Sequence, residues 1–371
     1  MKALRTWLLA LFLMGCVLAT PALAADTVAS GTCGAEGDNL AWTLDSEGVL
    51  TISGTGAMAD YSYSNKAPWN ENCDDIISVN IENGVTSIGA EAFRGYSNLT
   101  GITIADGVIS IGGSAFFGCG SLEGITIPAS VTSIGWGAFD GCSSLVSITI
   151  PDGVTSIDWW AFCDCSSLTG ISIPDRVTSI GAYAFQNCES LKSVHIGSGV
   201  TSIGKQVFDG CSDLADVYLT DIAAWCQITF GSSDANPLYY ANNLYISDTK
   251  AETLGIPEGV KSISQYAFIN ATCIKRVALP KSLTSIAADA FSGCENIKNG
   301  HYAGGEDGWR IISIEEGNDA LKNAEISYNS TIDDFSCRIT VKTSDGGQAA
   351  GLGLRPAPAG VGGRHHPAGA V

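Results

Sequence analysis

Basic residues are scarce in this sequence of 371 residues: 19 Lys and Arg stand against 38 Asp and Glu, which gives a formal net charge of −19. An acidic surface repels phosphate backbones and anionic lipid, so the composition argues against nucleic acid as a partner and against docking to a charged membrane. Beyond the N-terminus no apolar run is long enough to cross a bilayer. We therefore expect no transmembrane segment in the mature chain.

Recognisable catalytic motifs are also missing. The chain has only four histidines, and none has a nucleophile motif such as G-x-S-x-G beside it. No glycine-rich phosphate loop opens a helix, and the acidic residues give no way to choose a catalytic pair among them. We therefore predict no catalytic residue, no cofactor and no metal site, and we interpret the chain as non-enzymatic.

The N-terminus has the pattern of an export signal over residues 1–24. "MKALRT" supplies positive charge, "WLLALFLMGCVLA" is an apolar stretch, and "ALA" at 22–24 fits a cleavage site. The mature chain then begins near Ala25. An alternative interpretation is that "LMGC" is a lipobox, which would leave a lipidated Cys16 at the new N-terminus.

A gapless internal repeat of 23 residues organises most of the chain. Repeats begin at Val79, Ile102, Ile125, Ile148, Ile171 and Val194, and two more begin at Leu254 and Val277. A fixed period of this size predicts a solenoid. Each unit is too small to bury its own apolar face, so neighbouring units must stack.

The positions within one repeat predict a coil of short strands. Ile125 and Ile127 alternate with Thr126, so the two isoleucines point inward and the threonine outward. The following "VTSIG" provides a second inward pair, and Ala138 and Phe139 fill the rest of the coil. Stacked repeats of this kind predict a continuous parallel sheet along the solenoid.

The pattern "SLxxITIPxxVTSIGxxAFxxC" resembles the BspA-type leucine-rich repeats of bacterial surface proteins over about residues 79–330. The resemblance implies a right-handed leucine-rich-repeat coil, with a parallel β-sheet on one face and short turns or 3-10 segments on the other. The preceding "NLAWTLDSEGVLTISGTGAMADY" resembles the β-rich module that often leads such arrays. Such a module would cap the open end of the sheet.

These observations predict a linear order of modules. After the signal, a β-rich capping module covers 25–78, six repeats cover 79–216, a variant island covers 217–253 and two further repeats cover 254–299. A cap-like repeat occupies 300–330, and 331–371 holds an incomplete module and a disordered tail. The island and the cap share a spacing, because Trp225 follows Tyr218 by seven residues and Trp309 follows Tyr302 by seven. We interpret both as structural variants rather than ligand loops.

Thirteen cysteines raise the question of disulfides. Six occupy one position of the repeat, namely Cys119, Cys142, Cys165, Cys188, Cys211 and Cys294. Tyr96 and Ala271 occupy the same position without a thiol, so we interpret these cysteines as buried small hydrophobic residues. A bridged ladder and a zinc site are the alternatives. A disulfide between Cys33 and Cys73 is a further hypothesis. Cys163 is expected to be more exposed than the repeat cysteines and the first thiol to react.

Four aromatic residues form the candidate binding site: Trp136, Trp159, Trp160 and Tyr183. They take positions that hold Glu91, Lys205 or Gln206 in other repeats, so they are expected to face solvent as one patch across three coils. Clustered exposed aromatic side chains often mark a contact surface. The alternative is that the rings lie flat, shield the turns or pack on the N-terminal module.

The sequence therefore favours an exported, non-catalytic binding scaffold. The resemblance implies a secreted or cell-surface bacterial protein that adheres to a host or microbial protein or glycan. Two alternatives remain: an accessory binding module of a truncated secreted hydrolase, and a structural spacer on the cell surface.

Overall fold

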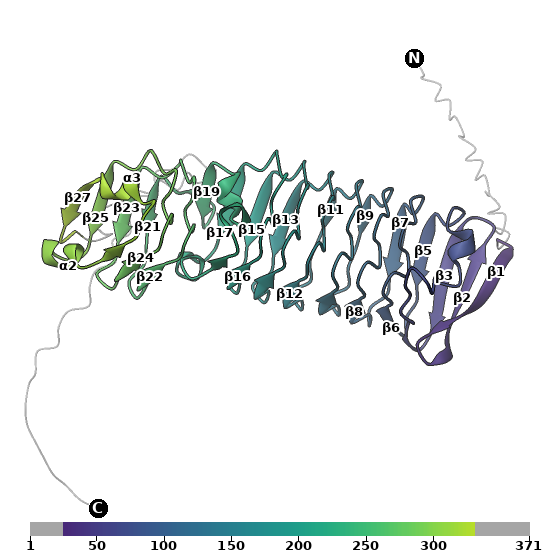
Figure 1. The fold of residues 1–371 in the computed structure, drawn as a ribbon. Coiled ribbons are helices and arrows are strands. Elements are labelled where there is room, and N and C mark those ends of the chain that lie inside the picture. Colours follow the sequence, from purple (N-terminus) through teal and green to yellow (C-terminus); the bar gives the residue numbers. More distant parts are fainter. Residues whose placement is uncertain (1–24, 331–371) are drawn as a thin grey trace, which may run out of the picture. The chain divides into compact units, whose positions relative to one another are not determined.

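The computed structural model describes residues 25–330, and the expected signal, Cys16 and the segment after residue 330 lie outside the described residues. The described residues form a solenoid in which successive repeats stack along one axis (Figure 1). Ile125 and Ile127 are buried and Thr126 is exposed. The predicted inward and outward alternation is therefore confirmed.

The first strand of each repeat builds three sheets along one side of the coil. The antiparallel strands β1 (Thr27–Gly34), β2 (Gly37–Asp45) and β3 (Val49–Gly54) lead the first sheet, and β3 pairs in parallel with β5. The N-terminal module is thus the start of the repeat sheet, where it supplies a hairpin at the open end. The remaining first strands are β5 (Ser78–Ile81), β7 (Gly101–Ile104), β9 (Gly124–Ile125), β11 (Ser147–Ile148), β13 (Gly170–Ile173), β15 (Ser193–Ile196), β17 (Asp216–Leu219), β19 (Asn243–Ile246), β21 (Thr253–Gly255), β23 (Arg276–Leu279), β25 (Asn299–Tyr302) and β27 (Glu325–Tyr328). The short strand β20 (Thr249–Lys250) runs back antiparallel to β19 at the end of the second sheet.

The "TSI" segments form a second set of parallel strands, which the sequence indicated only as a second inward pair. Ile134 aligns with Ile157, and Ile157 with Ile180, so the register advances by one repeat per strand. These strands form two sheets, interrupted at the island. They are β4 (Gly56–Ala57), β6 (Val85–Ile88), β8 (Ser110–Ile111), β10 (Ser133–Ile134), β12 (Ser156–Ile157), β14 (Ser179–Ile180), β16 (Ser202–Ile203), β18 (Thr229–Phe230), β22 (Ser262–Ile263), β24 (Ser285–Ile286) and β26 (Ser313–Ile314).

A continuous stack of phenylalanine rings fills the core between the strands and the turns. Ring centroids of successive residues lie 5.3 to 5.8 Å apart in the row Phe93, Phe116, Phe139, Phe162, Phe185 and Phe208. Trp69 extends this row into the N-terminal module, stacking on Phe93 at 5.6 Å. Each ring is buried against the repeat before and the repeat after it, which is why one repeat alone has no core.

Two variant repeats replace part of the regular turn by a helix. In the island, β17 is followed by α1 (Ile222–Trp225) and β18, and near the end β25 is followed by α2 (Glu306–Arg310) and β26. The Trp225 indole is buried and donates to the carbonyl oxygen of Ala267 at 2.7 Å. The short elements η1 (Asn70–Asn72), η2 (Ser233–Ala235), η3 (Pro237–Tyr239) and α3 (Asp319–Lys322) complete the fold.

The eleven cysteines that the structure describes are all free. The six repeat cysteines are buried, as predicted, and each thiol also donates to the carbonyl oxygen of a phenylalanine 26 residues earlier, at 2.9 to 3.3 Å. Cys33 and Cys73 are not joined, in contrast to the hypothesis of a disulfide.

Cys163 is only marginally more exposed than the repeat cysteines, which are at most 1 % exposed. Its side chain is buried at 5 % exposure, because it lies against Asp140 of the preceding repeat and the adjacent Asp164. Burial, followed by the charges of these two carboxylates, raises the pKa of Cys163 to about 12. A high thiol pKa and low exposure both reduce reactivity.

Candidate functional site

The four predicted aromatic residues lie in the turns that follow the second strands. Trp136 follows β10, Trp159 and Trp160 follow β12, and Tyr183 follows β14. The exposed fractions of the three tryptophans are 51 %, 57 % and 36 % in chain order, and Tyr183 is half-buried. The turn at the two tryptophans is fixed locally, because the amide of Trp159 donates to Oδ1 of Asp158 at 2.7 Å.

Three of these rings contact one another. The indole of Trp160 stacks on the ring of Tyr183 with 5.3 Å between centroids and 5° between planes. Trp159 meets Trp160 edge-on at 6.0 Å. Both geometries are favourable for aromatic pairs. We call Trp159, Trp160 and Tyr183 the aromatic patch.

Trp136 leans toward the preceding repeat. A Cβ placed on Gly113 would lie 2.5 Å from Nε1 of the Trp136 indole, so the glycine leaves the space that this ring occupies. Among the described residues no ring contact joins Trp136 to the aromatic patch, so Trp136 is an exposed side chain on the repeat before it.

Trp160 has an uncommon backbone conformation. Its φ is +54°, in the left-handed region that bulky residues seldom adopt. The same position is left-handed in Glu91, Ser114, Gly137, Tyr183 and Gln206, so the coil imposes this geometry on whatever residue is present. Backbone preference therefore does not explain a tryptophan here, and the left-handed φ belongs to the repeat rather than to a functional position.

Three polar side chains lie close together in the turns of the same region of the coil. One ligand atom each from Asp140, Cys163 and Asp164 lies within 4.8 Å of the others, so this group could hold a metal ion. Burial, followed by the charge of Asp164, raises the pKa of Asp140 to about 6. Three donors are fewer than the four of a closed structural zinc site, so a metal here would need water as a further ligand.

The sequence did not indicate a second ring stack, which lies on the outward side of the first strands. His195 stacks on Tyr218 at 4.2 Å, and Tyr218 on Tyr245 at 4.6 Å. The 23-residue spacing of His195 and Tyr218 was a usable signal. Tyr245 follows 27 residues later because the island lengthens the repeat, and pairing of β17 with β19 was needed to place it.

The helices of the described residues are too short and too polar to span a bilayer. The fold and the repeat pattern define the class: a leucine-rich-repeat solenoid, a class that generally acts by binding. The model of the BspA type leucine rich repeat region matches residues 69–166, 110–236 and 238–305, with six copies. The chain belongs to this family.

Solved structures with a similar fold come from several bacteria. A leucine-rich repeat protein from Eubacterium ventriosum is 24 % identical, with 82 % of this chain and 96 % of that chain covered and a TM-score of 0.37. A leucine rich cell surface protein from Faecalibacterium prausnitzii is 24 % identical, with 78 % and 98 % covered and a TM-score of 0.32. A leucine rich repeat protein from T. pallidum is 23 % identical, with 72 % and 91 % covered and a TM-score of 0.35. A comparison with curated proteins finds no match.

Proposed function

We propose that this chain is an exported, non-catalytic adhesion scaffold that contacts a host or microbial protein or glycan through the aromatic patch, with Trp136 beside it. The signal-like N-terminus supports export, and membership of the family supports a binding role. The assignment of the binding site to the aromatic patch is a separate inference, which is based on the exposed rings.

The exposed contact between Trp159, Trp160 and Tyr183 carries the proposal. Three aromatic side chains from two neighbouring repeats meet at a position where other repeats hold glutamate, lysine or glutamine. Solvation alone does not favour rings there, because their exposed apolar surface costs free energy in water. Rigid aromatic side chains bind proteins with little loss of conformational entropy, and their faces also stack on sugar rings.

The experiment compares attachment and stability of the double variant Trp159→Ala/Trp160→Ala with those of the unaltered chain. The probes are immobilised host matrix proteins and an array of neutral and acidic glycans. We expect attachment to fall at least about tenfold, which corresponds to about 1.4 kcal/mol. The melting temperature should change little, because neither indole belongs to the buried phenylalanine stack.

A matched control removes two rings from the other stack, as Tyr218→Ala/Tyr245→Ala. This control should keep attachment to the same probe. Loss of attachment in the control and retention in the tryptophan variant would place the site on the first strands and contradict the proposal. A large fall in melting temperature of the tryptophan variant would show that the indoles stabilise the coil and are not a binding site.

A further inference from the structure

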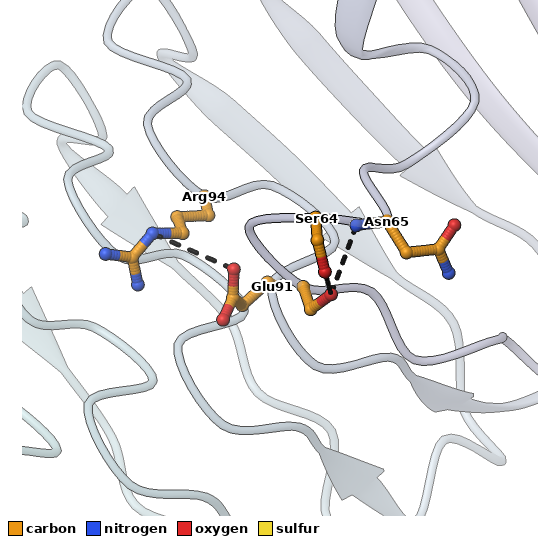
Figure 2. Close-up of polar contacts among 5 residues, drawn as sticks. Ser64, Asn65, Glu91 and Arg94 are labelled. Atoms are coloured by element: carbon orange, nitrogen blue, oxygen red, sulfur yellow. Dashed lines mark hydrogen bonds and ion pairs between the residues drawn. The ribbon is translucent and has the colours of Figure 1, made fainter.

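A small cleft lies where the N-terminal module meets the first two repeats. It encloses about 200 Å³, and its lining includes Tyr63, Lys66 and Asn70 from the module and Glu91, Arg94 and Phe117 from the repeats. Figure 2 shows Arg94 and Glu91, joined by their ion pair, beside the module loop that carries Ser64 and Asn65. This cleft is separate from the aromatic patch in the sequence and lies on different repeats.

The walls of the cleft are held in place by hydrogen bonds. The loop is closed by Ser62 and Asn65, whose backbones bond to each other at 2.9 and 3.1 Å, and the Asn65 amide also donates to the Ser62 hydroxyl. The loop is tied to the first repeat because Tyr61 N donates to Ala90 O at 2.9 Å and Ala90 N donates to Asp60 Oδ1 at 2.8 Å. The cleft is therefore preformed.

The charge within the cleft differs in sign from that of the whole chain. Acidic residues outnumber basic ones by two to one in the sequence, 38 against 19. The cleft instead gathers two cations, Lys66 and Arg94, around one carboxylate, Glu91. Within residues 25–330 the ion pairs are Arg94 with Glu91, Lys275 with Glu252 and Arg310 with Glu306, so Lys66 belongs to none of them.

The guanidinium of Arg94 is held by the protein but makes few polar contacts with it. Its central carbon lies 4.1 Å from the centroid of the Phe117 ring, a cation–π contact that helps to position the group. Its Nε lies 3.8 Å from Oε2 of Glu91, which is longer than a hydrogen bond. Among the described residues no hydrogen bond from the Arg94 side chain to the protein is found, so the N–H donors of the guanidinium remain available to a ligand.

We propose that this cleft binds the carboxylate of an acidic sugar, as a terminal uronic acid residue would present it. The free edge of Arg94 would pair with the carboxylate through two parallel hydrogen bonds, and Lys66 would add a second positive charge. The Glu91 carboxylate and the Asn70 amide offer hydrogen-bonding atoms to neighbouring hydroxyl groups. The lining also includes the rings of Tyr63 and Phe117, and aromatic faces can stack on a sugar ring. This mixture of charged, amide and aromatic groups suits an acidic sugar.

The acidic remainder of the surface restricts how such a ligand can bind. A polymer of uronic acids would be repelled wherever it left the cleft, because the rest of the protein carries the same sign of charge. The cleft therefore suits recognition of one terminal residue rather than of a stretch of chain.

The experiment titrates the full chain with glucuronate by calorimetry and ligand-observed NMR, with glucose, acetate and sulfate as comparison probes. We expect glucuronate to bind and glucose to show no comparable binding. Arg94→Gln should weaken glucuronate binding at least about tenfold. Arg94→Lys should also weaken it, because an ammonium keeps the charge and loses the fork. Glu91→Gln should strengthen it, because that variant removes the competing carboxylate.

The matched control is Arg310→Gln, since Arg310 also pairs with an exposed glutamate, Glu306 in helix α2. This variant should bind glucuronate like the unaltered chain. If Arg94→Gln does not fold, as judged by its melting curve, Lys66→Gln serves in its place, because Lys66 is exposed and outside the core. Equal binding of glucose and glucuronate, unchanged binding in the folded variant, or binding of acetate or sulfate as tight as that of glucuronate would overturn the proposal. The aromatic patch is intact in all these variants, so this test and that of the adhesion site can fail separately.

Discussion

The thiol of Cys165 donates a hydrogen bond to the carbonyl oxygen of Phe139, 26 residues earlier, with 3.2 Å between sulfur and oxygen. The same oxygen accepts the amide of Cys142 at 3.1 Å. The thiol therefore links two neighbouring repeats at a point where the backbone already turns. The cysteine thus fills a fully buried position and also donates a hydrogen bond between repeats. A need for apolar volume alone would not explain why this position holds a weakly polar side chain.

Cys165→Ala should lower the free energy of unfolding by about 1–2 kcal/mol, because it leaves a small cavity and removes a weak donor. The loss stays moderate because the Phe139 oxygen keeps its amide partner, and Ala271 occupies the same position naturally. Chemical denaturation of the variant measures this. The control is Cys73→Ala, at a half-buried thiol, which should change stability by less. An equal loss in both variants would contradict the linking role of Cys165.

Phe139→Ala should cost about 3–5 kcal/mol, because it removes a fully buried ring from the middle of the stack. Phe116 and Phe162 each lose a stacking partner at 5.4 Å, so the damage should extend to both neighbouring repeats. Hydrogen exchange should show weaker protection in the repeats on either side. A melting temperature within about 1 °C of that of the unaltered chain would refute the core position of Phe139.

Among the described cysteines, Cys73 should react first with a thiol reagent, and Cys163 should be protected. Cys73 is half-buried, whereas Cys163 and the six repeat cysteines are buried. Burial also raises the pKa of the Cys163 thiol and that of the Cys165 thiol. Peptide mapping after brief labelling of the native protein measures the order, and labelling after denaturation shows that each thiol can react. If Cys163 were labelled before Cys73, the predicted order would be wrong, and the expectation from the sequence that Cys163 reacts first would be supported.

The repeat predicted the coil, the buried phenylalanines and the buried cysteines because each depends on a residue that recurs every 23 positions. Contacts made by residues that are found in only one repeat could not be predicted from the repeat pattern. Cys163 is buried by Asp140 and Asp164, and neither carboxylate recurs in most repeats. The direction of Trp136 likewise depends on Gly113 in the neighbouring repeat. The exposure of the aromatic patch was predicted, since a position that accepts charge elsewhere must reach solvent.

Asp140 should destabilise the fold at neutral pH. Burial, followed by the charge of Asp164, raises the pKa of Asp140 from 3.8 to about 6 in the folded state. The folded protein therefore holds the proton more tightly, and the stability gained from protonation is present below about pH 4 and lost as the pH rises through about 6. Asp140→Asn should add about 1 kcal/mol at pH 7, a value reduced for partial exposure.

Denaturation between pH 4 and 7 tests this, because Asp140→Asn should flatten the profile in that range. Asp164→Asn is the control that keeps the Asp140 carboxyl and removes a neighbouring charge, so it should flatten the profile only in part. Identical profiles for the unaltered chain and Asp140→Asn would show that Asp140 does not titrate abnormally.

Trp160→Gly should be more stable than Trp160→Ala by about 1 kcal/mol, because glycine adopts a positive φ without the steric cost that alanine meets. The φ of Trp160 is +54°, and Gly137 occupies the same position one repeat earlier with a φ of +56°. Both variants lose the stacking on Tyr183 equally, so the difference between them reports the backbone alone. Trp159 provides the matched control, because it is not among the residues with positive φ, and there Trp159→Gly should be less stable than Trp159→Ala. Chemical denaturation of the four variants gives both differences. The same sign at the two positions would contradict a left-handed Trp160, and with it the argument that this indole is retained against the preference of the backbone.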